Sequence, residues 1–422
     1  MRLRRCLLAT LAILGCAGTP PAAGSELSLA ARRADFETLW QAVAEDYVYL
    51  DGKRPWWATA RERYARRVAA ANTADAWATA VEDALDELHD FHVGVRPGSA
   101  RRWLPVPTAA DLWAVPDGGA ALITAVREGS DAARAGLGVD DRIEAIGGDP
   151  VATAIDRRLG RAVNLADSDA RQWALLSLVT GRRGEARAFV VSRAGAARRL
   201  VTLPAVRRFD RPAEPVSWSR LPGGIGIIRI NNSLGRQETV SAFDAALASL
   251  RDTRALILDL RDTPSGGNSG VALGILGRFV TARAPYQRHR IPRYGQPDVE
   301  RNWQEEVASR GPFAYEGRLV VLVDHWTGSM AEGMAIGVDG MHRGTVIGTT
   351  MGQLAGAGED VKLPRTGLTV TLPGEELFHV DGTPRHRWVP PVVVDPTGAP
   401  GDADPILARA RKILDEPPGI AR

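Results

Sequence analysis

The spacing of apolar residues changes twice along the chain. In residues 27–88, apolar side chains such as Phe36 and Leu39 recur at intervals of three and four, as an amphipathic helix requires. A capping pattern at 72–77 opens a further helix in the same stretch. We therefore expect an N-terminal helical bundle of about three helices over residues 27–100.

From residue 103 the pattern consists of short apolar runs separated by turn residues. Residues 121–126, 189–193 and 200–203 each predict a strand. They predict a small β domain over residues 103–205.

From about residue 216 the apolar runs become nearly continuous, which is typical of strands buried on both faces. Helical stretches alternate with them, so residues 210–416 predict an α/β core with a mainly parallel sheet. The overall fold class is thus multidomain, α+β and α/β. The predicted strands are 225–230, 255–260, 319–323 and 346–347, and the predicted helices are 240–250, 271–280, 330–337 and 402–414.

The first residues carry a targeting pattern. The basic segment Met1–Arg5 precedes an apolar run at 6–15, which at about ten residues is too short to span a bilayer as a helix. This predicts a secretory signal peptide over residues 1–24. Two cleavage sites stay open. A lipobox ending at Cys16 would make that residue the lipidated start of the mature chain, and the small residues near 21–24 suit ordinary cleavage.

Composition excludes several classes of function. Cys6 and Cys16 are the only cysteines, so the mature domains hold no internal disulfide. The seven histidines lack the HExxH type of spacing, so we expect neither a metal site nor a cofactor. The net charge is only +3 and no Lys/Arg stripe is interleaved with aromatic residues, which argues against a nucleic-acid partner.

Segment 319–335 contains the first candidate for chemistry. A buried strand is predicted to end at Asp324, and after a short turn a helix begins near Ser329. Such a turn places a serine hydroxyl over the end of the sheet, beside the free amides and positive dipole end of the helix. Serine is also a common N-cap residue, so this position alone does not identify a nucleophile.

Two other segments supply what acyl transfer needs. Residues 255–267 predict a strand that runs into a glycine-rich loop, where Gly266 and Gly267 can present backbone amides to an oxyanion. The helical region closes on His92, an imidazole suited to general-base catalysis at neutral pH. Together with Ser329 these groups form a minimal acyl-transfer site.

These segments resemble the S41 peptidases, which include the C-terminal processing and tricorn-like serine peptidases. The middle stretch, with GSDAARAGL at 129–137, resembles a PDZ domain. PDZ domains capture chain ends by strand addition, although here the module would alternatively only pack on its neighbours or gate the site. The peptidase resemblance rests on ELHDFHVGV at 87–95, DLRDTPSGG at 259–267, TGSMAE at 327–332, GTTMG at 348–352 and DGTPRHRWVP at 381–390.

The resemblance implies roles for particular residues. Ser329 would be the nucleophile and His92 the general base. The amides of Met330 and of Gly266 or Gly267 would form the oxyanion hole.

The same resemblance separates two branches of the family. The Ser-Lys branch has a lysine shortly after the strand that ends at Gly348, whereas here the first lysine is Lys362. The Ser-His branch therefore fits better. Thr263 replaces the asparagine that is common in the family's glycine-rich loop.

The late segment departs from the Ser-His branch. The family's glutamate is replaced by His386, or by Arg385 if the register shifts by one residue. Losing an orienting acid can lower kcat by as much as ~10⁴. Three alternatives are open: another carboxylate substitutes, His386 makes a different polar contact, or the protein is a degenerate peptidase. The candidate carboxylates are Asp90, Glu375, Glu376 and Asp381.

The sequence thus predicts an exported serine endopeptidase of the tail-specific type that uses a Ser-His acyl-enzyme mechanism. Its substrate would be a peptide or an unfolded chain, captured by its C-terminus. We expect it in the bacterial periplasm or cell envelope, with a lipid anchor in the outer membrane where one exists. The alternative is a catalytically degenerate, peptide-binding envelope lipoprotein. The oligomeric state is not predicted.

Overall fold

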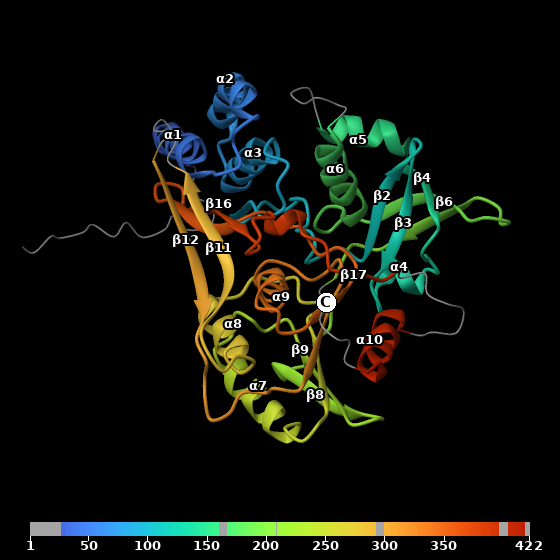
Figure 1. Ribbon diagram of the computed structural model, residues 1–422. Coiled ribbons are helices and arrows are strands. Elements are labelled where there is room, and N and C mark those ends of the chain that lie inside the picture. The colour runs from blue at the N-terminus through green and yellow to red at the C-terminus, as the bar shows by residue number, and fades with distance from the viewer. Residues whose placement is uncertain (1–26, 160–166, 208, 293–298, 396–403, 418–422) are drawn as a thin grey trace, which may run out of the picture.

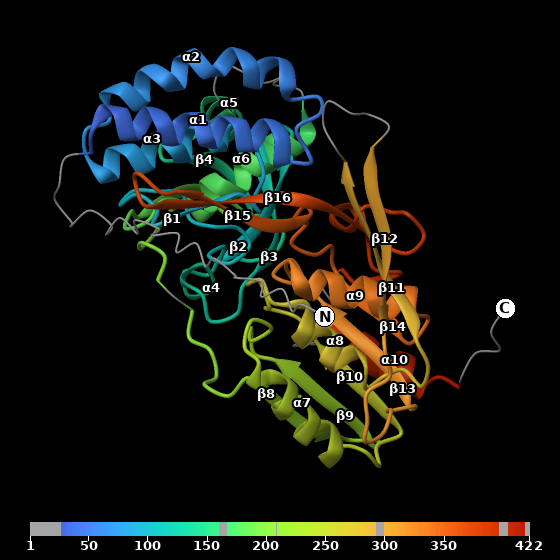
Figure 2. The same cartoon turned by 90° about the vertical axis from the view of Figure 1, so that its left-hand side faces the viewer.

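The computed structural model describes residues 27–159, 167–207, 209–292, 299–395 and 404–417. Figures 1 and 2 both show the N-terminal helices at the top, above β16, and the α/β sheet with its helices at the bottom. The predicted signal peptide and Cys16 lie outside the described residues.

Three helices open the described chain: α1 (Leu29–Asp46), α2 (Arg54–Ala70) and α3 (Ala74–Asp86). The side chain of Ser28 caps α1 and that of Thr73 caps α3 by accepting backbone amides. The predicted helices are confirmed. They do not enclose a core of their own, however, because their apolar faces share one with strands from the C-terminal half, namely Leu363, Leu368, Val370 and Leu372.

Those strands belong to a sheet that the sequence pattern did not reveal. Its order is β1 (Gly94–Arg96), β16 (Leu368–Phe378), β11 (Ala284–Pro292) and β12 (Glu300–Val307), with β15 (Ala357–Leu363) also paired to β16. All these pairings are antiparallel. The sheet links the N-terminal helices to the α/β core, because β11 packs against α9 of that core.

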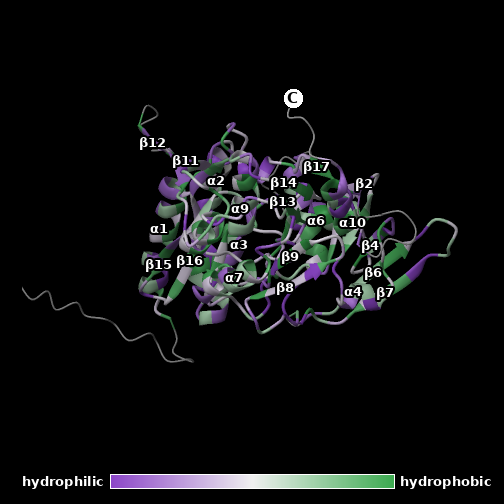
Figure 3. Ribbon diagram, turned by 60° about the horizontal axis from the view of Figure 1, so that its bottom comes forward, coloured by the Kyte–Doolittle hydropathy of each residue, from purple (hydrophilic) through white to green (hydrophobic). Residues whose placement is uncertain are grey.

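The middle stretch folds into an antiparallel sheet in which each predicted strand is present. The order is β2 (Leu112–Asp117), β3 (Ala120–Val126), β4 (Arg142–Ile146), β6 (Arg187–Ser192) and β7 (Arg199–Leu203), with β5 (Asp149–Pro150) paired to β4. Helices α4 (Asp131–Arg134), α5 (Val151–Leu159) and α6 (Ser168–Thr180) complete it. Hydrophobic residues, green in Figure 3, run through α6, whose buried side packs on β2. The PDZ-like identity of this unit stays a prediction.

The C-terminal half contains the predicted α/β fold. Its sheet has the order β17 (Val392–Val393), β14 (Thr345–Gly348), β13 (Arg318–Val323), β10 (Ala255–Asp259), β9 (Ile225–Ile230) and β8 (Val216–Leu221), parallel except at β8. The helices are α7 (Glu238–Ser249), α8 (Ser269–Leu276), α9 (Met330–Gly340) and α10 (Pro405–Asp415), with a 3₁₀ turn, η1, at Arg385–Arg387.

Alternation along β10 shows why its sequence is apolar throughout. Leu256 and Leu258 join the core on the side of α7 to α9, and Ala255 and Ile257 join the core on the side of α10. Because β10, β13 and β14 are parallel, their carboxyl ends meet at one edge of the sheet. Ligand and catalytic groups gather at such an edge in α/β folds.

Candidate active site

The turn after β13 holds Ser329 in a strained conformation. Its backbone has φ +54° and ψ −112°, a region that residues other than glycine rarely adopt. The turn is fixed by Asp324, whose Oδ1 accepts the amides of Trp326 at 2.9 Å and Asp262 at 3.2 Å. The strain therefore coincides with the predicted nucleophile, as in other exposed serine elbows.

His92 reaches this turn from the N-terminal part of the chain. Its Nε2 lies 3.2 Å from the Oγ of Ser329. Asp90 fixes the backbone there, because its Oδ1 accepts the His92 amide at 2.8 Å while its Oδ2 accepts the Tyr47 hydroxyl at 2.9 Å. The structure thus brings together the two residues on which the predicted chemistry depends.

The other ring nitrogen of His92 defines its tautomer. Nδ1 lies 2.8 Å from the carbonyl oxygen of Ala355, which can only accept, so Nδ1 carries the proton. Nε2 then presents its lone pair to the Ser329 hydroxyl, the arrangement that a general base needs. Burial lowers the pKa of His92, the positive charge of Arg385 lowers it further, and the bond to Ala355 opposes both effects.

Ser329 is flanked by the predicted oxyanion-hole residues. A Cβ placed on Gly266 would lie 3.6 Å from Ser329 Oγ, so this glycine directly faces the nucleophile. Met330 begins α9, where backbone amides have no acceptor within the helix. The amide of Ser329 itself donates to Glu332 Oε2 at 2.7 Å.

Gly267 has a different environment from Gly266. A Cβ there would lie 2.8 Å from the carbonyl oxygen of Leu234, so close backbone packing requires glycine. Thr263 is also structural, since its hydroxyl donates to the Ile230 carbonyl at 3.2 Å and its own carbonyl accepts the Gly328 amide at 3.1 Å.

The predicted substitute carboxylates do not contact the His92 ring. Asp90 bonds the backbone of His92, Glu375 pairs with His289, Glu376 pairs with Arg290, and Asp381 lies 3.0 Å from His379. In the part of the chain that the structure describes, no carboxylate bonds Nδ1 of His92. The acceptor there is a backbone carbonyl, which leaves no signature in the sequence.

In the late segment the Arg385 side chain is buried, whereas the His386 ring packs against Tyr49. The Nη2 of Arg385 donates to the carbonyls of Leu354 at 3.0 Å and Gly356 at 2.7 Å. His386 stands edge-on to Tyr49, with 5.4 Å between ring centroids, and burial lowers its pKa to about 4. Of the two registers that the sequence left open, Arg385 is the one whose charge acts on His92.

Residues 224–394 match the family model described as peptidase family S41. This part of the chain is an S41 peptidase domain. The family is one of serine peptidases, and the match covers Ser329, the glycine-rich loop and the late segment. His92 comes from outside the matched residues.

Solved structures share the fold of the S41 domain and of the regions around it. A photosystem II D1 C-terminal processing protease has 18% identity and a TM-score of 0.55, covering 91% of this chain and 97% of that one. Mature CPAF has 13% identity and a TM-score of 0.59, covering 86% of this chain and 92% of that one. At these identities the likeness establishes the fold only.

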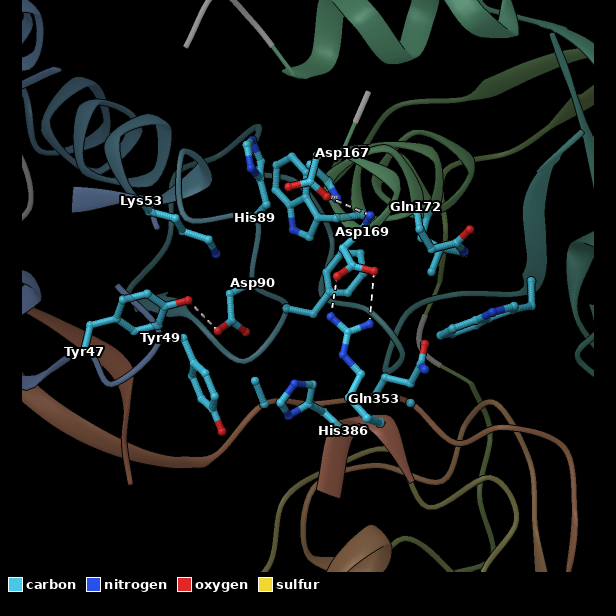
Figure 4. Close-up of a pocket in the computed structure, with 18 residues that line it drawn as sticks. Tyr47, Tyr49, Lys53, His89, Asp90, Asp167, Asp169, Gln172, Gln353 and His386 are labelled. Atoms are coloured by element: carbon cyan, nitrogen blue, oxygen red, sulfur yellow. Dashed lines mark hydrogen bonds and ion pairs between the residues drawn. The ribbon is translucent and has the colours of Figure 1, made fainter. Parts of the chain in front are cut away.

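A cavity of about 300 Å³ adjoins the S41 site (Figure 4). Asp90, Ala355 and His386 line it. Asp90 and Ala355 both bond His92, and His386 is the sequence neighbour of Arg385. Across it Asp169 pairs with Arg387, and Lys53, whose pKa is lowered by burial, donates to the Leu88 carbonyl. The remaining lining includes the aromatic residues Tyr47, Tyr49, Phe91, Trp113 and Trp173.

Two other histidines lie against tryptophan rings. His325 stacks on Trp113 with ring centroids 4.9 Å apart, and His89 lies 4.8 Å from Trp173. Burial lowers their pKa values to about 4 and about 3. No group of three or more metal-binding side chains occurs among the described residues. Over the same ranges, no helix has both the length and the apolar character needed to cross a membrane.

Proposed function

We propose that this chain is an active serine peptidase that hydrolyses peptide bonds through an acyl-enzyme on Ser329. The observation that carries the proposal is the 3.2 Å approach of His92 Nε2 to Ser329 Oγ, with the proton held on Nδ1 by Ala355. A hydroxyl and an imidazole in this arrangement are the reacting pair of acyl transfer.

The first half-reaction forms the acyl-enzyme. Ser329 Oγ attacks the scissile carbonyl carbon while His92 Nε2 takes the hydroxyl proton. The amides of Met330 and Gly266 would receive the developing oxyanion, at the helix end and at the glycine that faces Oγ. The imidazolium then returns its proton to the departing amine, and the peptide C–N bond breaks.

The second half-reaction restores the enzyme. Water attacks the ester carbonyl, and His92 takes a proton from it as the second tetrahedral intermediate forms. Ser329 Oγ leaves and recovers its proton from His92, releasing the new carboxylate.

Digestion of a diverse peptide mixture, followed by mass spectrometry, tests this function. The mature chain is expected to cleave, and Ser329→Ala or His92→Ala to lower kcat by up to about 10⁶-fold with folding unchanged. Undiminished cleavage by either variant would refute the dyad.

The rival is a degenerate peptidase that binds peptides without cutting them. It is favoured by the lack of a carboxylate on His92 and by the positive charge of Arg385 nearby. A wild type that binds peptides in a fluorescence-anisotropy titration, but cleaves none of them, would support it.

Export, lipidation at Cys16 and capture of substrate C-termini complete the proposal. The basic and apolar residues before Cys16 support the first two. If Cys16 is lipidated, Cys16→Ser is expected to move the protein from the membrane fraction to the soluble fraction. Capture by C-termini, suggested by the PDZ-like pattern, predicts that amidated peptides are cleaved more slowly than free acids.

A further inference from the structure

Arg385 belongs to the late segment in which the Ser-His branch was expected to carry its glutamate, at residue 386 or, with the register shifted by one, at 385; its side chain is only 3% exposed. Its two hydrogen bonds reach the carbonyls of Leu354 and Gly356. These carbonyls flank Ala355, whose own carbonyl faces His92. The guanidinium therefore holds the chain on both sides of the Ala355 carbonyl, which bonds Nδ1 of His92.

Glu332, in the first turn of α9, also bonds the segment around Ala355 and links it to Ser329. Its Oε2 accepts the amides of Ser329 at 2.7 Å and Leu354 at 3.3 Å. Leu354 is thus bound through its N–H by Glu332 and through its C=O by Arg385. Burial raises the pKa of Glu332 to about 7, and the charge of Arg385 opposes that shift. Two residues of opposite charge therefore join the serine turn to the segment that faces the imidazole.

We propose that Arg385 is a positioning residue, which keeps the Ala355 carbonyl on the His92 ring and so replaces the orienting work of the absent acid. This inference rests on the peptidase function proposed above. The replacement is geometric only, because a carbonyl is neutral and a guanidinium disfavours the imidazolium that forms during acyl transfer. The result is a base with the correct tautomer and a weakened affinity for its proton.

Arg385 and Asp90 act on the His92 ring from the late segment and from its own loop, with opposite signs. The charge of Arg385 also acts on Glu332, from α9, whose pKa it lowers against the effect of burial. Removing Arg385 should thus change both the position of the Ala355 carbonyl and the pKa of His92. Removing a residue that only supports the fold would not change these two properties together.

The test follows His92 directly, by NMR of the mature chain labelled with ¹⁵N in its histidine rings. Loss of one signal in His92→Ala assigns the resonance. We expect the wild type to carry its proton on Nδ1 and to titrate below the ordinary 6.5. Arg385→Met is expected to mix the tautomers, raise that pKa and lower kcat by about 10- to 100-fold with little change in KM. Arg385→Lys, which keeps the charge, should lie between the two.

Arg32→Met is the matched control. Arg32 is also buried and also donates to backbone carbonyls, those of Leu27, Val68 and Ala69. The Arg32→Met variant should leave the His92 signal and kcat unchanged even if it lowers the stability of the protein. If Arg385→Met does not fold, Arg385→Gln carries the same expectation with a polar side chain.

The outcomes separate the two proposals. An Arg385→Met or Arg385→Gln protein with wild-type tautomer, pKa and kcat would overturn the positioning role. A wild type that cleaves nothing, yet shows the expected NMR changes on substitution, would refute the peptidase function and retain the role of Arg385 in holding His92.

Discussion

His92 is oriented by a neutral backbone group, and that determines what kind of base it would be in the proposed peptidase. The Ala355 carbonyl fixes the tautomer as a carboxylate would. It adds no negative charge, however, and burial together with Arg385 lowers the pKa of the ring. We therefore expect correct geometry with modest proton affinity at this residue.

A pH profile of kcat/KM tests this directly. The base must be neutral, and because its pKa is lowered from 6.5, it stays neutral as the pH falls through that value. The acid limb is therefore expected below pH 6.5, measured on one peptide between about pH 4 and about pH 8 with circular dichroism as a folding control. A midpoint at or above 6.5 would contradict the account of His92.

Restoring the family's acid at position 386 should bring no gain. The Nδ1 proton of His92 already donates to Ala355, and the ring of His386 stands against Tyr49 instead. We expect His386→Glu to keep kcat/KM within a factor of about three of the wild type. An increase of about 10² or more would show that residue 386 is the vacant acid position.

At the scale of the element, the glycine-rich loop after β10 contains two neighbouring glycines in different surroundings. A Cβ on Gly266 would lie 3.6 Å from Ser329 Oγ, whereas Gly267 packs on the backbone of Leu234. The same substitution should thus lower mainly activity at position 266 and mainly stability at position 267.

Alanine at each position tests that difference. Gly266→Ala leaves room for its methyl group and keeps the backbone amide, but it places the methyl group beside Ser329 Oγ, so kcat/KM should fall by about 10- to 100-fold with little change in Tm. Gly267→Ala would put its Cβ 2.6 Å from that of Leu234, so it should cost about 1–3 kcal/mol of stability. Kinetics and thermal denaturation of both variants distinguish them, and the reverse pattern would contradict this reading of the loop.

At the scale of the whole molecule, local patterns predicted local elements and missed the pairing of distant ones. Continuous apolar runs identified β9, β10, β13 and β14, and the Ser329 turn followed from the strand before it. The sheet of β1, β11, β12, β15 and β16 was missed because β11, β12 and β15 are mostly exposed or half-exposed, and because β1 and β11 pair with β16 across long stretches of chain. The Ala355 acceptor was missed because a main-chain carbonyl is the same at every residue.

The N-terminal helices and the S41 domain share one core and one candidate site. The helices pack on Leu363, Leu368, Val370 and Leu372, and the loop after α3 carries His92 to Ser329. Residues 210–422 alone should therefore expose these apolar side chains and lack His92. We expect that fragment to aggregate or unfold and to be inactive, by size-exclusion chromatography, circular dichroism and peptide cleavage, next to residues 25–422 as control. A monomeric fragment that unfolds cooperatively and cleaves at the full rate would contradict this view.

The activated state of Ser329 is the central claim, and covalent labelling by a fluorophosphonate, read by intact-protein mass spectrometry, tests it without a known substrate. The folded mature chain should gain one adduct, mapped to Ser329, Ser329→Ala should gain none, and His92→Ala should react at least about 100-fold more slowly. A folded wild type that stays unlabelled, or a Ser329→Ala variant labelled as fast as the wild type, would contradict the account.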